Sequence, residues 1–310
     1  MATRPPVLQR GDTVGIVTLA SPYPSEYINK AVANLKKSGF NVVLGKHVYS
    51  QNGIVAGTDE QRASDLMDMF VDKRVKMIMS TRGGTGSLGV LPHLDYNIIA
   101  RNPKIVSGYS DISIVLNVLN QFTGLITFIG LMLEDFVPTT PAYNFTSFYT
   151  AVSTFQSPRQ ILNPPNIPLR SLVSGNVTGR IVGGNLTSIV DSLGTPYEID
   201  TRGKILLLEE QREPSTTIYR YLNHLKIAGK FRDCVGIIMG ECTDCIEAYG
   251  KSWDDVINDL LIPLGKPLIK NLTTSHGVYK ATIPIGANVN LDSRNGKITV
   301  LEPAVSWSRA

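Results

Sequence analysis

The sequence predicts an α/β protein, with a three-layer α/β sandwich and mostly parallel sheet in an N-terminal domain and a smaller β-rich α+β C-terminal domain. In the first half, short β-rich runs alternate with helical periods, which is typical of a parallel sheet covered by helices. Between residues 156 and 168, repeated prolines remove backbone donors and block helix. Beyond this break, strands and helices mix without regular alternation.

Each expected element is supported by its own residues. Apolar β-rich runs predict strands at residues 14–19, 40–44, 75–79, 104–107, 179–182, 204–208, 235–239, 281–285 and 297–301. Apolar residues at helical spacing predict helices from 25 to 39, from 58, from 112, near 216–225 and near 253–261. Thr58 and Gln61 form a capping box, which marks a helix start.

The chain length favours two domains. At roughly 100 to 200 residues per domain, 310 residues are long for a single unit. We expect an α/β domain at residues 1–156, a linker at 157–175 and a β-rich domain at 176–310.

Composition and charge exclude several function classes. The 30 basic and 26 acidic residues leave a net charge of +4 without a basic run, so a nucleic acid polymer is not an expected partner. The N-terminus has no apolar segment of a secretory signal, which predicts a cytoplasmic protein. The most apolar stretch, residues 112–132, contains Asn117, Asn120 and Gln121, so we expect a buried helix and strand, and no membrane association.

The three cysteines predict neither a disulfide framework nor a metal site. Cys242 and Cys245 form one C-x-x-C, but a structural zinc site needs two more ligands at suitable spacing. We therefore expect ordinary reduced thiols. No H-E-x-x-H or paired-histidine spacing predicts a metal site, and we expect no cofactor.

Ser110 is a candidate nucleophile because of where it stands. It follows the strand ending at Ser107 and precedes a helix, so a sharp turn lifts it clear of the sheet beside the free N–H groups of the helix start. An ordinary N-cap serine is an equal alternative. The glycines after Arg82, including Gly83 and Gly84, follow another strand and permit close backbone approach to a ligand, or form only a flexible turn.

Few residues of the sequence are candidates for a catalytic base and its carboxylate partner. Of the four histidines, His276 alone lies in a polar loop between expected strands, where catalytic side chains are often displayed. Glu209 ends a buried strand, and a carboxylate there needs a partner. Because strand side chains alternate, we expect Glu209 and Glu210 on opposite sides, one for chemistry and one in solvent. A strand that simply meets water is an equal reading of Glu209.

Seven segments together resemble the LD-carboxypeptidase family of serine peptidases, which includes the self-immunity peptidases that inactivate microcin C. They follow the family's order over nearly the whole chain, at residues 11–15, 80–84, 103–111, 124–128, 179–186, 205–210 and 275–286. The resemblance implies a Ser-Glu-His triad split between the two domains, which corresponds to Ser110, Glu209 and His276. It also implies an interdomain active site and a homodimer.

The resemblance further implies an oxyanion hole formed by backbone amides of the double-glycine turn, Gly84 or Gly83, and of Asp111. Two positions depart from common family patterns. After the phenylalanine, many relatives have an aromatic residue or histidine followed by glycine-proline, whereas this chain has Ile129, Gly130 and Leu131, so we expect a changed substrate wall there. Ser275 before His276 is similar to the microcin-type branch, whereas many murein-recycling members have glycine.

The expected activity is hydrolysis of a peptide amide near a free carboxylate, through an acyl-enzyme. Candidate substrates are the L,D bond of a murein tetrapeptide and the aminoacyl-nucleotide bond of a microcin C-like compound, with Arg82 meeting the carboxylate. Two alternatives stay open: a non-catalytic two-lobed protein that binds a small molecule, and an esterase or lactonase using the same triad.

Overall fold

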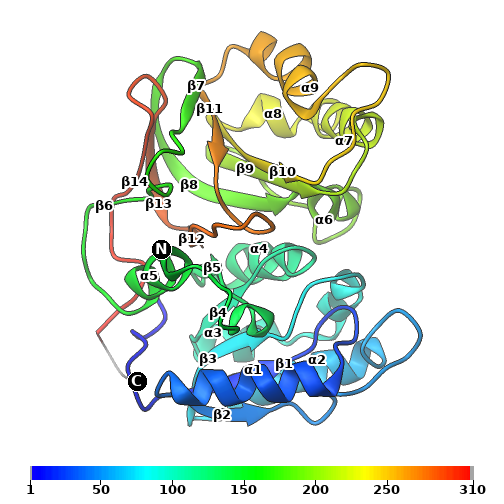
Figure 1. The fold of residues 1–310 in the computed structure, drawn as a ribbon, viewed down its shortest axis with the longest axis vertical. Helices are drawn as coiled ribbons and strands as arrows, with labels where there is room; N and C mark the ends of the chain where they lie inside the picture. The colour runs from blue at the N-terminus through cyan, green and yellow to red at the C-terminus, as the bar shows by residue number, and fades with distance from the viewer. Residues whose placement is uncertain (1, 308–310) are drawn as a thin grey trace.

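The computed structural model describes residues 2–307 and has two lobes, each built around its own β-sheet (Figure 1). This mixed α/β architecture confirms the predicted fold class. The sheet of the first lobe has the order β12-β5-β4-β3-β1-β2. Its strands are β1 (Thr13–Val17), β2 (Asn41–Leu44), β3 (Val75–Ser80), β4 (Ile105–Gly108), β5 (Thr127–Ile129) and β12 (Ile283–Ile285).

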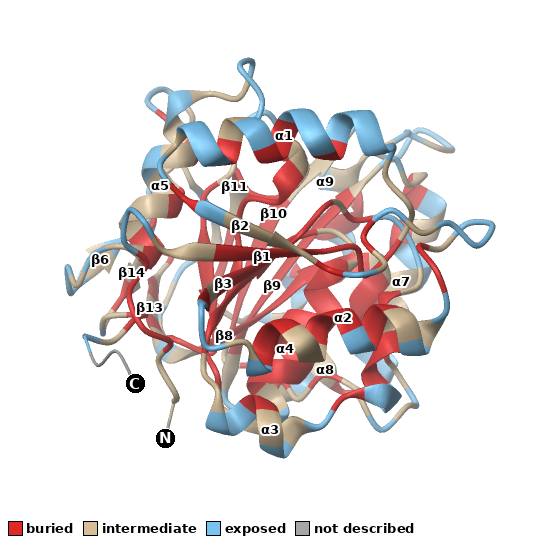
Figure 2. Ribbon diagram, turned by 90° about the horizontal axis from the view of Figure 1, so that it is seen from below, coloured by how far each residue is buried: buried red, intermediate tan, exposed pale blue. Residues whose placement is uncertain are grey.

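The helices of the first half alternate with these strands, as the sequence pattern predicts. They are α1 (Ser25–Lys37), α2 (Asp59–Val71), α3 (Tyr96–Arg101), α4 (Ile112–Thr123) and α5 (Ala142–Val152), with 3-10 turns η1 (Ser87–His93) and η2 (Leu133–Asp135). The predicted capping box of Thr58 and Gln61 is present at the start of α2. Strands β1 and β3 are largely buried, edge strand β2 is not, and α1 covers the sheet with its outer face exposed (Figure 2).

The second lobe is built on an eight-stranded sheet of order β6-β14-β13-β8-β9-β10-β11-β7. Its strands are β6 (Arg159–Gln160), β7 (Arg170–Val173), β8 (Asn176–Asn185), β9 (Lys204–Gln211), β10 (Gly236–Thr243), β11 (Leu268–Leu272), β13 (Asn288–Asp292) and β14 (Lys297–Val300). Its helices are α6 (Leu186–Asp191), α7 (Ser215–Ile227), α8 (Lys230–Asp233) and α9 (Trp253–Leu260), with 3-10 turn η3 (Ile262–Leu264). The central strands β8 to β11 run parallel, so their carboxyl ends share one edge.

Helix α4 joins the two lobes. Every residue from 112 to 120 is buried, and the helix contacts β5 of one sheet and β8 of the other (Figure 1). The Asn117 side chain hydrogen-bonds both the N–H and the C=O of Gly183 on β8, each at 2.8 Å. The helix that follows Ser110 is therefore fixed against both sheets.

Strand β12 crosses from the second half of the chain into the first sheet. It pairs antiparallel with β5, with Ile283 opposite Ile129. The strand predicted at 281–285 is thus present, but it completes the sheet of the first lobe. The expected linker segment also contains strands β6 and β7, and the domain boundaries at 156 and 176 stay predictions.

The prediction of reduced thiols at Cys242 and Cys245 is wrong, because the two form a disulfide. Cys242 lies in β10, and the chain turns back directly after this strand at Asp244, whose φ is +55°. This left-handed turn brings the two cysteines together. Cys234 is a free, buried thiol.

Candidate active site

Ser110 lies on a strained turn between β4 and α4. Its φ is +60°, a left-handed conformation that costs a non-glycine residue about 1 to 2 kcal/mol. Asp111, not Ser110, is the N-cap residue of α4. The alternative that Ser110 is an ordinary helix cap is therefore wrong, and the turn presents its side chain at the start of a helix.

The double-glycine turn lies against Ser110. A Cβ atom placed on Gly83 would lie 2.6 Å from Ser110 Cβ, 2.8 Å from Ser110 Oγ and 3.6 Å from the backbone N of Asp111. Gly84 is exposed, with φ of +124°. Ser87 holds Asp111 from the same turn, because its N–H donates to the Asp111 carboxylate at 2.8 Å and its hydroxyl to the Asp111 carbonyl at 2.6 Å. The glycine turn and the start of α4 thus form one unit.

Glu209 and His276 meet in the second lobe. His276 Nδ1 lies 2.7 Å from Glu209 Oε2, and the side chains are 7% and 1% exposed. Burial lowers the pKa of His276, but the charge and hydrogen bond of Glu209, aided by the charge of Glu210, raise it, and the net shift is upward. The loop position predicted for His276, between β11 and β12, is confirmed.

The prediction that one of the two adjacent glutamates faces solvent is wrong. Glu210 is 3% exposed and accepts hydrogen bonds from the side chain of Asn185 at 2.8 Å and from the N–H and hydroxyl of Thr187 at 2.8 and 2.7 Å. Both faces of β9 are covered: Leu207 packs into the core shared with the first lobe, and Leu208 into the core of the second. Strand alternation holds, but neither face meets water.

Two further acidic side chains, Glu134 and Asp135, lie beside the turn that carries Ser110. The Tyr109 hydroxyl lies 3.3 Å from Glu134 Oε1 and 3.4 Å from Asp135 Oδ1. Burial raises the pKa of both carboxyls, and it raises that of Tyr109 strongly. The Tyr109 ring meets the His276 ring edge to face, with centroids 5.5 Å apart. Sequence reasoning missed these residues, although Tyr109 directly precedes the candidate nucleophile.

The two residues expected to contact substrate have different surroundings. The Arg82 guanidinium lies over the Tyr23 ring, 5.6 Å from its centroid, and Arg82 Nε is buried without a hydrogen-bond partner. Ile129 is fully buried on β5, opposite Ile283. Its predicted contact with substrate stays a prediction.

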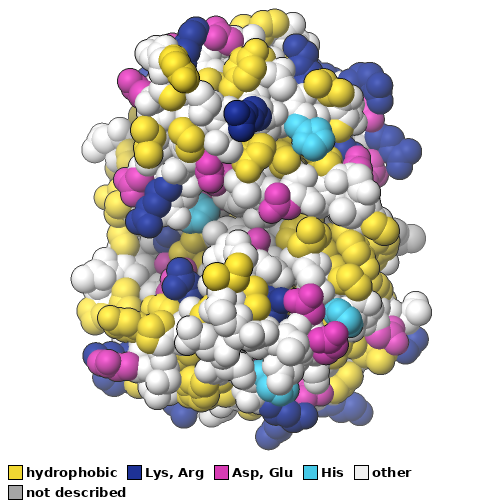
Figure 3. Space-filling model, turned by 90° about the vertical axis from the view of Figure 1, so that its right-hand side faces the viewer, with side chains coloured by type: hydrophobic (Ala, Val, Ile, Leu, Met, Phe, Trp, Pro, Cys, Tyr) yellow, Lys and Arg dark blue, Asp and Glu magenta, His cyan; other side chains and the backbone are white. Residues whose placement is uncertain are grey.

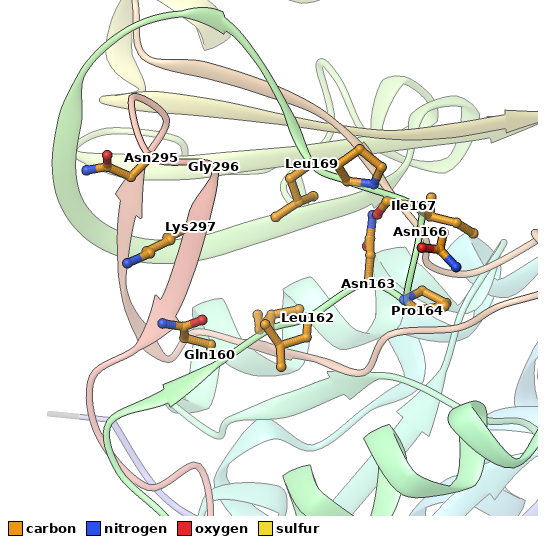
Figure 4. A pocket seen from close by; sticks show the side chains of 12 residues that line it. Gln160, Leu162, Asn163, Pro164, Asn166, Ile167, Leu169, Asn295, Gly296 and Lys297 are labelled. Atoms are coloured by element: carbon orange, nitrogen blue, oxygen red, sulfur yellow. The ribbon is translucent and has the colours of Figure 1, made fainter.

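The surface between the lobes is hollowed, with a histidine and acidic side chains visible in the hollow (Figure 3). A pocket of about 450 Å³ beside the histidine loop is lined in part by Glu241, Lys270 and Gly277. A larger pocket of about 510 Å³ lies elsewhere, between residues 160–169 and the turn at 295–297, and none of the predicted site residues lines it (Figure 4). Of these two pockets, the one lined by Gly277 lies next to His276.

Two further features of residues 2–307 bear on function. No helix there is long and apolar enough to cross a membrane. Within the same residues, no group of three or more His, Cys, Asp or Glu side chains is arranged to hold a metal ion.

Curated relatives match this chain over almost its whole length. A probable murein peptide carboxypeptidase of Bacillus subtilis is 35% identical over 306 residues, covering 98% of this chain and 95% of the relative. The microcin C7 self-immunity protein MccF of Escherichia coli is 29% identical, with 96% of each chain covered.

Solved structures share the fold. MccF in complex with glutamyl sulfamoyl guanosine superposes with a TM-score of 0.92 at 28% identity, covering 98% of this chain and 99% of that one. A muramoyltetrapeptide carboxypeptidase of Oxalobacter formigenes gives a TM-score of 0.82 at 24% identity, covering 93% and 97%. The profiles of the LD-carboxypeptidase N-terminal and C-terminal domains match residues 14–130 and 178–291. The chain therefore belongs to the LD-carboxypeptidase family of serine peptidases.

Proposed function

We propose that this peptidase cleaves an amide bond near a free carboxylate, with Ser110 as nucleophile, His276 as base and Glu209 as the residue that orients the base. The supporting observation is the buried 2.7 Å contact between His276 Nδ1 and Glu209. A carboxylate at Nδ1 fixes the imidazole tautomer and leaves Nε2 free to accept a proton. The His276 ring also contacts the ring of Tyr109, which directly precedes Ser110, and this supports Ser110 as the third member of the triad.

The reaction follows from these roles. His276 Nε2 takes the proton of Ser110 Oγ as the oxygen attacks the amide carbon, and the protonated ring then gives that proton to the leaving amine. Water, activated by the same nitrogen, attacks the acyl-enzyme and releases Ser110 and the acid. N–H groups of Gly84 or Gly83 and of Asp111 stabilise the oxyanion, and loss of one such donor costs about 3 kcal/mol in the barrier.

Two substrate classes are proposed: the L,D bond of a murein tetrapeptide and the aminoacyl-nucleotide bond of a microcin C-like compound. The relatives support both, because one is named for murein peptide and another for microcin C7 immunity. MccF structures also contain glutamyl sulfamoyl guanosine and aspartyl sulfamoyl adenosine. Arg82, whose Nε has no hydrogen-bond partner, is the proposed carboxylate ligand.

Labelling with a serine-reactive fluorophosphonate tests the proposed nucleophile and base. We expect one label, mapped by mass spectrometry to Ser110, absent in Ser110→Ala and strongly reduced in His276→Ala. His224→Ala is a matched control, because His224 lies on α7 away from the pair. A folded wild-type protein that takes no label would contradict the proposal and favour a non-catalytic binder.

Digestion of the two candidate substrates tests the specificity. Mass spectrometry should show loss of the terminal D-amino acid from murein tetrapeptide or release of the nucleotide part from processed microcin C. Cleavage only of simple esters would favour the esterase reading. A homodimer and a cytoplasmic location stay proposals, the first to be tested by light scattering on the purified protein.

A further inference from the structure

The loop that carries His276 is held by a lysine that the sequence did not single out. Lys280 Nζ donates hydrogen bonds to the carbonyl of Ser275 and, at 3.2 Å, to that of Gly277. These two carbonyls flank His276 on either side. The Lys280 side chain is only 12% exposed, so the bonds form largely out of contact with water.

This loop needs such a restraint. Ser275 has φ of +62°, and its hydroxyl is buried without a hydrogen-bond partner. A non-glycine residue keeps that conformation only where its surroundings enforce it. Asn144 of α5 fixes the other part of the loop, because its side chain accepts from the N–H of Lys280 at 2.9 Å and donates to the carbonyl of Val278 at 3.0 Å.

The ammonium group of Lys280 also contacts residues close to the proposed nucleophile. It lies 4.6 Å from the centre of the Tyr109 ring, a cation–π distance, and 3.8 Å from Asp135 Oδ1. The same Tyr109 ring meets His276 edge to face, and Tyr109 precedes Ser110. A single buried charge thus contacts the loop of the base, the residue before the serine and a carboxylate of η2.

Acidic side chains from several elements surround His276, and Lys280 places a positive charge among them. Glu209 and Glu210 of β9 act on the imidazole and raise its pKa, and Lys280 lowers it. Asp135 of η2 is acted on by both His276 and Lys280. Glu134 of η2 and Glu241 of β10 lie within reach of the lysine charge as well.

We infer that Lys280 is a positioning residue, which holds the loop of His276 so that the ring faces Glu209 on one side and the Tyr109-Ser110 turn on the other. The inference rests on the proposed function of His276 as the base. Lys280 itself is not assigned any contact with substrate. Its role combines geometry, through the two carbonyls, with a positive charge among several acidic groups.

The test uses the rate at which a fluorophosphonate labels Ser110, measured from pH 5 to pH 9 in wild type, Lys280→Met, Lys280→Gln and Lys280→Arg. Positioning errors of this kind cost about tenfold to a hundredfold, so Lys280→Met and Lys280→Gln should label at least tenfold more slowly. Loss of the charge that lowers the pKa of His276 should also move the acid limb of the profile to higher pH. Lys280→Arg, which keeps the charge, should keep the limb near its wild-type position.

Lys266→Met is the matched control. Lys266 Nζ also donates to two carbonyls two residues apart, those of Arg232 and Cys234, but it lies before β11, at the end of the strand away from His276. Its loss should leave the labelling rate and its pH profile unchanged.

The outcomes separate this inference from the proposed function. Wild-type protein that does not label would overturn both. Wild-type labelling together with unchanged rate and pH profile in a folded Lys280→Met or Lys280→Gln variant would overturn this inference alone. A slower rate with an unmoved acid limb in both variants would also overturn it, since a merely structural role predicts that result. Circular dichroism melts establish which variants fold, and the glutamine variant carries the test if the methionine variant does not.

Discussion

The charge of a single imidazole is set by opposing neighbours. The pKa of His276 is raised overall, so its neutral, proton-accepting form predominates only at a higher pH than for an ordinary histidine. We therefore expect the rate of acylation to rise with pH along a limb centred above the pKa of an ordinary histidine. The carboxylate of Glu209 is the main cause that raises this pKa.

Glu209→Gln tests this balance. With the charge removed, burial dominates and lowers the pKa of His276, so the acid limb should move to lower pH. The maximal rate should fall by about 10⁴-fold, because the amide no longer enforces the productive tautomer or stabilises the imidazolium. Measurement of the rate against pH checks both effects. A limb that stays in place would show that Glu209 does not act on His276.

Gly83→Ala tests the close contact beside the nucleophile. The added methyl group would lie 2.6 Å from Ser110 Cβ, so Ser110 or the glycine turn must move. Because a displacement near 1 Å can cost about 100-fold, we expect at least that loss of labelling and only a small change in melting temperature. The control is Gly53→Ala, where the methyl meets nothing within 4 Å but the φ of +62° strains alanine, so this variant reports a backbone effect without a contact to Ser110. Full activity in Gly83→Ala would mean that the turn is not part of the site.

At the scale of single elements, contacts between distant parts of the chain fix the position of helix α4. Helix α4 carries the nucleophile turn at its start and is anchored to β8 through Asn117 and Gly183. Asn117→Ala leaves a buried N–H and C=O of Gly183 unpaired, and we expect about 3 kcal/mol of destabilisation. Urea unfolding measures this change. Asn223→Ala, a half-buried position on α7 whose side-chain hydrogen bond is exposed, should change stability by less than about 0.5 kcal/mol. Equal effects of the two variants would argue against the anchor.

Sequence patterns predicted the elements whose evidence is local. The alternation from β1 to α4 and the capping box of α2 appear where expected, because periodicity and capping are properties of neighbouring residues. Strand β12 was placed in the wrong lobe, because its partner β5 lies far away in the sequence. Strands β6, β7, β11 and β13 and helices α3, α5, α6 and α8 were not predicted.

In the candidate site, too, local sequence patterns predicted the individual residues but not the contacts between distant segments. Ser110, Glu209 and His276 each stand at a strand end or in a loop, which local reasoning identifies, but only the family resemblance grouped them. The burial of Glu210 depended on knowing that both faces of β9 are covered. The contact of Lys280 with the Tyr109 ring joins segments that are distant in the sequence, so no local pattern could predict it.

On the scale of the whole molecule, the two lobes share one hydrophobic core. That core contains residues of β1 and β4 together with Ile205, Ile269 and Val289 of the second sheet. We therefore expect the protein to unfold in a single cooperative transition. The tryptophans report on different regions, since Trp253 begins α9 and Trp307 stacks on Phe155.

Single-tryptophan variants, Trp253→Phe and Trp307→Phe, make this expectation measurable. Fluorescence of the remaining tryptophan in each variant should give urea midpoints that coincide with each other and with circular dichroism. Separate midpoints would show that the lobes unfold independently and that the shared core does not couple them.

The crossing of β12 also bears on how the polypeptide can be divided. A fragment that stops at residue 156 lacks β12, so β5 becomes an open edge with unpaired main-chain groups, the kind of edge that recruits other chains. Such a truncated fragment should precipitate or self-associate. Supplying the remainder of the chain in trans should restore the missing strand, and with it the segment that follows His276.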